Sequence, residues 1–237
     1  MIMICRISDL FVDVPAAGDL VSRCQEYICE ETGGADIIIR TDLFHLDSWK
    51  NLTQDQVIYM ESGIAFYREL LKHKGLLLHA SAVEVDGKGY LFSGDCGAGK
   101  STHTKIWQAT FGEAAQVFND DKPALRCLDG KWYAYGTPWC GKDGINQNKK
   151  VPLAGICFLK QAGENKIRRL SQRESVQNIL AQTLRRFRMI ENLDLMTSHV
   201  GNLVMNIPVF ELENRPEPEA AHLSYETMRR AAEELGL

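Results

Sequence analysis

Gly94-Asp95-Cys96-Gly97-Ala98-Gly99-Lys100-Ser101 is the stretch that decides the fold of this 237-residue chain. It matches the Walker A pattern G-x-x-x-x-G-K-[S/T], in which a glycine-rich loop turns its backbone N–H groups toward the phosphates of a nucleotide. The glycines permit the positive φ angles of such a loop and let its backbone approach anionic oxygen. The stretch therefore predicts a nucleotide-binding site, and a chance glycine-rich turn is the alternative.

The flanking residues favour a strand, a loop and a helix in that order. Gly89–Ser93 is a short apolar run typical of a buried strand, and Ser101–Trp107 can open a helix. A helix N-terminus adds partial positive charge where phosphates bind. The residues that we expect to bind ATP are Gly94, Asp95, Cys96, Gly97, Ala98, Gly99, Lys100, Ser101 and Thr102.

Composition and charge limit the class of protein. Hydrophobic residues make up 45% of the chain, which is ordinary for a soluble globular protein, so we expect one domain or one domain with a small appendage. The net charge of −4 gives no general attraction to nucleic acid or to an acidic membrane. The chain has no apolar run of the roughly 20 residues that a membrane span needs, and its start does not resemble a signal peptide. We expect neither nucleic acid nor a membrane as a partner.

The seven cysteines are odd in number, scattered and without a C-x-x-C pair. This pattern argues against a disulfide framework or a zinc site and favours reduced thiols in the cytoplasm. Cys96 lies inside the glycine-rich loop, where it is either oxidation-sensitive or simply a small side chain in a tight place.

Residues 1–74 are predicted to form a small N-terminal lobe, and residues 75–237 a P-loop kinase domain. Two segments of the lobe are strand-like, residues 4–14 and 35–40, and residues 20–30 fit either a helix or a strand. The strands of the lobe could alternatively continue one sheet with the rest of the chain.

A helix is predicted over residues 54–73 of this lobe. Thr53 and Gln56 have the spacing of a capping box at its start. Its apolar residues recur at helical spacing: Val57, Met60, Ile64, Tyr67 and Leu71.

From residue 75 onward the pattern is one of hairpins. Asp86-Gly87 separates strand-like runs over 76–85 and 89–93, and Asp129-Gly130 separates runs over 123–128 and 131–135, which is a strong hairpin signal. Such sparse alternation of strands and helices favours an α/β fold with a mixed sheet over a plain doubly wound sheet. The further expected segments are a strand over 114–118, a loop over 136–152, a strand over 153–160, a helix over 171–188, a strand over 203–212 and a helix over 217–235.

Two adjacent carboxylates, Asp120 and Asp121, follow the apolar run at 114–118. Phosphoryl transfer needs a metal, an activated acceptor and neutralised charge. Lys100 is expected to reach the terminal phosphates, and the Ser101 hydroxyl to ligate Mg²⁺. One aspartate could hold Mg²⁺ while the other accepts a proton. Because neighbours on a strand point to opposite faces, both can serve one site only if the strand ends there. A solvated Asp-Asp turn is the alternative.

Together with His79, these motifs resemble the catalytic core of the HPr kinase/phosphorylase family, which is related in fold to phosphoenolpyruvate carboxykinase. The resemblance covers roughly residues 75–160 and implies the P-loop fold of the C-terminal domain of these kinases. It implies that Asp120 is the general base on an acceptor hydroxyl, and the acid in the reverse reaction. It further implies that Asp121 and Ser101 support Mg²⁺ and that His79 lies beside the reacting groups.

The sequence also departs from that family. Thr102 stands where the family has a glutamate, and Cys96 replaces the usual loop serine. The N-terminal domain of full-length HPr kinases is not recognisable in residues 1–75. HPr itself is therefore not the expected substrate.

Other side chains have a functional and a structural interpretation. Lys142, Lys149 and Lys150 in the 136–152 loop, and Arg185 in a basic cluster, could contact substrate or could be solvated. His79 and His103 could serve the site or be core histidines. Two tryptophans, Trp107 and Trp139, could line a ligand pocket or pack in the core.

The sequence thus predicts an ATP- and Mg²⁺-dependent phosphotransferase acting on a hydroxyl, either a serine of a peptide or protein or a small molecule. A phosphorylase or hydrolase working in reverse, and a nucleotide-binding regulatory module, are the alternatives. The intact Asp120-Asp121 pair favours catalysis, since a binding module needs no base. The family resemblance suggests a homo-oligomer.

Overall fold

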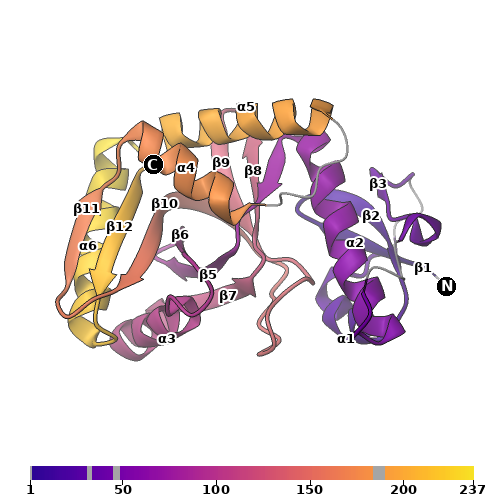
Figure 1. The fold of residues 1–237 in the computed structure, drawn as a ribbon, viewed down its shortest axis with the longest axis horizontal. Helices are drawn as coiled ribbons and strands as arrows, with labels where there is room; N and C mark the ends of the chain where they lie inside the picture. Colours follow the sequence, from indigo (N-terminus) through magenta and orange to yellow (C-terminus); the bar gives the residue numbers. More distant parts are fainter. Residues whose placement is uncertain (1, 31–33, 45–48, 184–189) are drawn as a thin grey trace.

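The computed structural model describes residues 2–30, 34–44, 49–183 and 190–237, and Figure 1 shows their arrangement. The described strands form two sheets, a small one of three strands and a large, curled, mixed one of nine. This confirms the expected mixed α/β class. The small sheet consists of β1 (Ile2–Ile7), β2 (Leu10–Pro15) and β3 (Ile37–Ile38).

The large sheet is built from the remaining described strands: β4 (Gly75–Leu77), β5 (Ala80–Val85), β6 (Lys88–Ser93), β7 (Gln116–Asp121), β8 (Ala124–Leu128), β9 (Lys131–Tyr135), β10 (Lys150–Gln161), β11 (Lys166–Arg169) and β12 (Val209–Asn214). The described α-helices are α1 (Asp19–Arg23), α2 (Gln54–Leu70), α3 (Lys100–Phe111), α4 (Gln172–Gln182), α5 (Ile190–Asn206) and α6 (Pro218–Glu234).

The long strand β10 holds the large sheet together. Its first residues pair antiparallel with β9, and its later part lies parallel between β6 and β12. The order along the sheet is β4-β8-β9-β10-β6-β5-β7, while β12 and β11 branch from β10. The sheet curls because β10 pairs antiparallel with β9 at its start and parallel with β6 and β12 further along.

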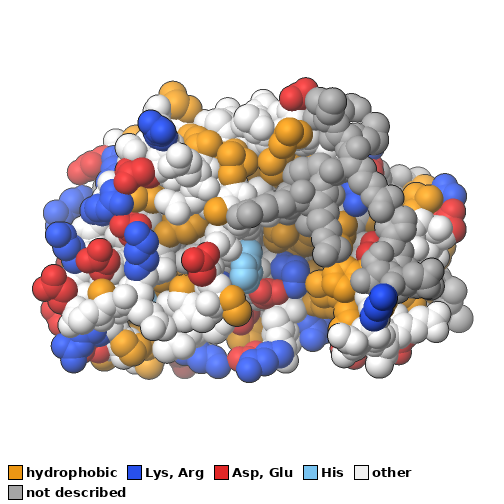
Figure 2. All heavy atoms as spheres, in the orientation of Figure 1, with side chains coloured by type: hydrophobic (Ala, Val, Ile, Leu, Met, Phe, Trp, Pro, Cys, Tyr) orange, Lys and Arg blue, Asp and Glu red, His pale blue; other side chains and the backbone are white. Residues whose placement is uncertain are grey.

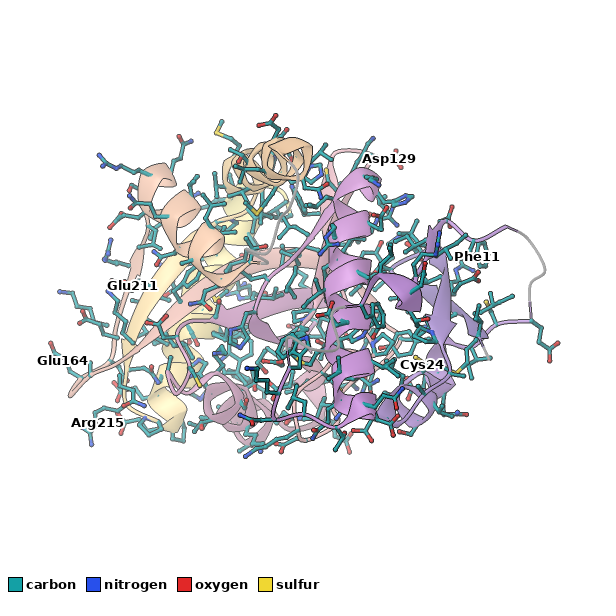
Figure 3. All side chains as sticks on the ribbon, turned by 45° about the vertical axis from the view of Figure 1, so that its right-hand side comes forward. Phe11, Cys24, Asp129, Glu164, Glu211 and Arg215 are labelled. Carbon is teal, nitrogen blue, oxygen red and sulfur yellow. The ribbon has the colours of Figure 1, made fainter. Side chains whose placement is uncertain are left out.

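Both expected hairpins are confirmed. The β5–β6 turn has positive φ at Asp86 (52°) and Gly87 (72°), and the β8–β9 turn has it at Asp129 (50°) and Gly130 (78°). Two consecutive positive φ angles match the right-handed twist of the strands that such a turn joins. Asp129 lies at the outer end of its hairpin (Figure 3).

The start of α2 is also as expected. The Thr53 hydroxyl accepts a hydrogen bond from the Gln56 N–H (3.3 Å), and the Gln56 side chain accepts one from the Thr53 N–H (2.9 Å). This reciprocal capping box satisfies two N–H groups that an isolated helix end leaves unpaired.

Two strand predictions need correction. The run at 76–85 is divided between β4 and β5, which pair with different strands, and His79 lies in the break. The chain expected as a strand over 203–212 is helical to Asn206, and β12 begins at Val209. Leu203, Ile207 and Val209 are all buried, and a mostly apolar run does not by itself distinguish a buried helix from a buried strand.

Two other segments also differ from expectation. Residues 20–30 contain the short helix α1 and a 3₁₀ turn at Gln25–Tyr27 rather than one element. The helix expected over 171–188 is described to Gln182, and residues 184–189 lie outside the described residues.

Helices cover both faces of the large sheet (Figure 1). On one face α4 and α5 bury Ile179 and Leu203 against strand residues such as Ile156. On the other face α3 and α6 bury Trp107 and Met228. No helix of the described ranges is long and apolar enough to cross a membrane.

The small sheet and α2 share a third apolar core with the large sheet. Leu20 and Phe66 of this core pack with Tyr135 and Trp139 from beyond residue 75. Figure 3 shows α2 between the small sheet, marked by Phe11, and the rest of the molecule. The division into domains at residues 74 and 75 stays a prediction.

His103 belongs to the α3 face of the core rather than to the site. Its Nε2 accepts a hydrogen bond from Trp107 Nε1 (3.2 Å) and lies 3.1 Å from Ser224 Oγ. Burial lowers the pKa of His103 to about 4, because the apolar surroundings disfavour the charged ring.

This burial predicts a pH-dependent loss of stability. In the unfolded chain His103 takes up a proton near pH 6.5, whereas the folded chain resists it until about pH 4. The contribution of His103 to stability is therefore complete above pH 6.5 and is lost as the pH falls toward 4, by about 2 kcal/mol between pH 7 and pH 5. Chemical denaturation of wild type and His103→Gln at both pH values measures it. An equal pH dependence in the two proteins would contradict this role of His103.

Candidate functional site

The pairing of β5 with β6 and β7 creates the site. Both neighbours run antiparallel to β5, so their C-terminal ends lie at its N-terminal end. Ala80 pairs with Ser93 on one side and with Asp121 on the other. The glycine-rich loop that follows Ser93, the aspartate pair and His79 therefore meet at one edge of the sheet.

Strand β7 ends at the aspartate pair. Asp121 is its last residue and has a φ of 89°, which is rare for a residue with a side chain and costs on the order of 1–3 kcal/mol. The strand expected over 114–118 runs instead over Gln116–Asp121 and includes both aspartates. The departure from extended backbone occurs at Asp121, where the strand ends.

The Gly94–Ser101 loop connects β6 to α3. Gly94, Gly97 and Gly99 all have positive φ, at 141°, 83° and 95°. A Cβ on Gly94 would lie 3.0 Å from the Leu159 carbonyl oxygen, so a side chain there meets backbone. Gly99 caps α3, whose first N–H groups therefore face the loop.

Lys100 and Ser101 make different contacts within the site. The Lys100 ammonium donates to the carbonyl oxygens of Gly94 (2.9 Å) and Asp95 (3.1 Å). The Ser101 hydroxyl lies 2.9 Å and 3.1 Å from the two carboxylate oxygens of Asp120. The loop and the aspartate pair, which the sequence suggested separately, are thus in direct contact.

His79 joins the aspartate pair to α4. Its Nε2 lies 2.9 Å from Asp121 Oδ1, and its Nδ1 lies 3.2 Å from Gln182 Oε1. Gln182 donates in turn to Asp95 of the loop (3.0 Å). Because both partners of the ring are oxygen acceptors, both contacts form when each ring nitrogen carries a proton. His79 is therefore a partly buried partner of the aspartate pair rather than an isolated core histidine.

The Asp121 carboxylate is held in its ionised form. Burial alone would raise its pKa, but the hydrogen bond from His79 and the ammonium of Lys122 outweigh burial and hold the pKa well below its ordinary value. A negative charge is therefore maintained at this point across the physiological pH range.

The 136–149 segment covers the outer edge of β7 and is held by α1. Gly141 donates its N–H to the Asp120 carbonyl (2.8 Å). The Arg23 guanidinium donates to the carbonyls of Cys140 (2.9 Å) and Gly141 (3.2 Å) and lies over the Tyr59 ring. The small lobe thus supports the segment that touches the aspartate pair.

The other side chains that the sequence suggested as ligand contacts lie in different parts of the structure. Lys142 is exposed and follows Gly141, which packs against Asp120. Lys149 and Lys150 pair with Glu84 and Asp9, away from the aspartate pair. Arg185 lies outside the described residues. Trp107 is a core residue, whereas Trp139 lines a cavity.

That cavity has a volume of about 490 Å³ and opens beside the aspartate pair. His79, Asp121 and Lys122 form its polar end. Figure 2 shows a hollow on this face where a histidine and charged side chains lie next to hydrophobic ones. Its walls come mainly from α2, Trp139 and the end of α4.

Sequence reasoning missed the part that α2 plays. Met60, Ile64 and Tyr67 are predicted only as apolar residues at helical spacing, whereas in the structure they line the cavity. Tyr59 and Gly63 continue that wall at helical spacing with Tyr67, which is the signal that was available in the sequence. Arg23 and Gln182 gave no local signal, because their partners are far along the chain.

The residues present fit a phosphate-bound Mg²⁺ rather than a metal held by protein alone. Among the described residues there is no group of three or more His, Cys, Asp or Glu side chains that could hold a metal ion. Mg²⁺ at a phosphate site usually takes one or two protein oxygens and completes its shell with phosphate and water. The Ser101 hydroxyl and the adjacent aspartates offer such oxygens.

Comparisons with known proteins give a family and remote structural likenesses. The family model of the SynChlorMet cassette protein ScmC matches residues 45–214. The chain belongs to this ScmC family. The matched span contains α2, the glycine-rich loop and the aspartate pair. No curated protein matches. Among solved structures, the Hpr(Ser) kinase/phosphatase from Coxiella burnetii is similar at 12% identity and a TM-score of 0.38, over 68% of this chain and 92% of that chain.

The support given by Arg23 is testable. In Arg23→Met the carbonyls of Cys140 and Gly141 lose their charged donor, so the free energy of unfolding should fall by about 1–3 kcal/mol. Hydrogen exchange at the Gly141 amide should become faster. Arg229→Met removes an exposed ion pair with Glu233 and should change stability by less than about 0.5 kcal/mol. Unchanged exchange at Gly141 in Arg23→Met would show that Arg23 does not hold this segment.

Proposed function

We propose that this protein is an ATP- and Mg²⁺-dependent phosphotransferase that moves the γ-phosphoryl group to a hydroxyl. The observation that carries the proposal is the meeting of the Gly94–Ser101 loop, His79 and the Asp120-Asp121 pair at one edge of the sheet. A nucleotide-binding module needs the loop alone. The two carboxylates beside it supply what transfer requires in addition.

The loop and α3 would bind the phosphates. The N–H groups at the start of α3 and the positive end of the helix face the loop, where anionic oxygen is favoured. The Lys100 ammonium, which rests on two loop carbonyls, can exchange these for phosphate oxygens. On another side of the loop a cavity of about 310 Å³, lined in part by Gly99 and Thr102, gives room for the nucleoside.

Mg²⁺, when bound, neutralises charge on the transferred group. Ser101 and Asp121 would provide its protein oxygens. Asp121 suits that role because its carboxylate stays ionised. Among neighbouring groups, Lys122 and His79 hold that carboxylate in place.

Asp120 would act on the acceptor. The acceptor oxygen attacks the γ-phosphorus, the bond between that phosphorus and the bridging oxygen breaks, and ADP leaves. The proton of the hydroxyl passes to the Asp120 carboxylate. In the reverse reaction the same carboxyl would return the proton.

The contact between Ser101 and Asp120 supports a second assignment of the two carboxylates. In it Asp120 shares the cation with Ser101, and Asp121 receives the proton. Both assignments keep the phosphotransferase reaction, and separate substitution of the two aspartates distinguishes them.

Transfer from γ-labelled ATP to serine-containing peptides or to proteins of a cell extract tests the proposal. Wild type should label an acceptor, and Asp120→Asn should lower the rate at least about 100-fold, because it removes the proposed proton acceptor. Asp129→Asn, at the distant β8–β9 turn, is the matched control and should label like wild type. Nucleotide binding without labelling, unaffected by Asp120→Asn, would instead indicate a regulatory module.

The Mg²⁺ dependence of the two variants separates the assignments. Asp121→Asn should raise the Mg²⁺ concentration for half-maximal rate by about tenfold or more, while Asp120→Asn should stay slow at every Mg²⁺ concentration. The reverse pattern would assign the cation to Asp120. No effect of either substitution would remove the aspartate pair from the reaction.

A further inference from the structure

We infer that the 490 Å³ cavity between α2 and α4 is the acceptor subsite, and that it takes a bulky apolar side chain next to the acceptor hydroxyl of a peptide. This inference rests on the proposed phosphotransferase function and specifies its substrate class.

The cavity is continuous with the proposed reaction centre. His79, Asp121 and Lys122 belong both to its lining and to the network around the aspartate pair. A molecule that enters the cavity therefore lies against the groups proposed for transfer. A volume of about 490 Å³ is within the range of small-ligand sites and accommodates an aromatic side chain together with adjoining backbone.

The polar atoms of the cavity wall are occupied by the protein itself. The Tyr59 hydroxyl donates to the Cys140 carbonyl (2.7 Å), the Tyr67 hydroxyl to the Lys122 carbonyl, and the Thr183 hydroxyl to the Leu77 carbonyl (2.6 Å). The two indoles behave likewise. Trp139 donates to Ser62 (3.0 Å) and Trp49 to Glu61 (2.7 Å). The wall therefore presents ring faces and carbon atoms to a ligand.

The distribution of charge in the lining also limits which ligands the cavity can bind. Within the lining described by the structure, the charged residues are grouped at the polar end, while Met60, Ile64 and Leu77 belong to the apolar wall. A free amino acid would bring an ammonium and a carboxylate into this space, and burying unpaired charge is costly. A peptide brings neutral amides, and its apolar side chain would be stabilised by leaving water. The chemistry of the walls therefore favours a peptide over a free hydroxy amino acid or a sugar.

The test uses γ-labelled ATP and short peptides with one serine. The residues beside that serine are tryptophan, phenylalanine or leucine in one set and alanine or aspartate in the other. Apolar flanks should raise kcat/KM at least about tenfold over alanine. Free serine should be a poor acceptor. Equal kcat/KM for all flanks, or transfer to free serine alone, would overturn the inference while leaving the phosphotransferase proposal intact.

A variant that places a charge in the apolar wall of the cavity tests the same inference from the protein side. Met60→Glu should raise KM for the apolar-flanked peptides at least about tenfold and so reduce the preference for apolar over alanine flanks, with KM for ATP unchanged. Met205→Glu, on the exposed side of α5, is the control for adding a charge at a methionine. If Met60→Glu affects all peptides equally, the cavity does not select the side chain.

A binding measurement that needs no phosphoryl transfer distinguishes failure of the peptide subsite from failure of the phosphotransferase function. Trp49 and Trp139 line the cavity, so their fluorescence should change when a peptide with alanine in place of serine is added. If no peptide is phosphorylated but the apolar peptide binds wild type and not Met60→Glu, the phosphotransferase proposal fails and the peptide subsite stands. If the apolar peptide does not bind, the subsite inference fails.

Discussion

Strand β5 pairs antiparallel with β6 on one edge and β7 on the other, and the positions of the polar groups of the site depend on this pairing. The pairing brings together three chain segments that are separate in sequence. A slip of β7 by two residues would move Asp121 about 7 Å from His79, since each strand residue advances by about 3.3 Å. A slip by one would turn the carboxylates to the opposite face. The buried side chains of β5 on both faces fix this register: Ala80, Ala82, Val83 and Val85.

The predicted small lobe, residues 1–74, contributes two structural features to this edge of the sheet. Arg23 holds the 140–141 backbone beside Asp120, and the stripe of α2 that contains Met60, Ile64 and Tyr67 forms a wall of the cavity. Phe66 stacks on Trp139 with ring centroids 4.7 Å apart, so α2 and the 136–149 segment are packed as one unit. Changes in the lobe are therefore expected to reach the site through packing and not only through direct contact. The span that the ScmC family model matches includes α2.

Features decided by local interactions were predictable from the sequence. The turns at Asp86-Gly87 and Asp129-Gly130, the capping box at Thr53 and the glycine-rich loop each follow from neighbouring residues. The aspartate pair was found because it directly follows an apolar run. The end of α5 at Asn206 was missed, because apolar residues lie on both sides of the boundary, Leu203 and Val209 among them.

Features decided by long-range contacts were not predictable. Arg23 reaches Cys140, which is 117 positions away, and Gln182 reaches His79 across 103 positions. No local pattern marks such pairs. The stripe on α2 was correctly identified as apolar, but an amphipathic pattern does not show whether the apolar face meets a core or a cavity. The sequence therefore predicted the glycine-rich loop and the aspartate pair of the candidate site, but not the cavity beside α2.

The proposed function requires a nucleoside triphosphate and an acceptor to meet at the sheet edge that contains Ser93, His79 and Asp121. A crystal structure with Mg²⁺ and a non-hydrolysable ATP analogue tests it most directly. We predict that the β- and γ-phosphates accept hydrogen bonds from the N–H groups of residues 95–101. The γ-phosphate should face Asp120 and the mouth of the cavity beside α2. Phosphates bound elsewhere, or a γ-phosphate turned away from the aspartate pair, would contradict it.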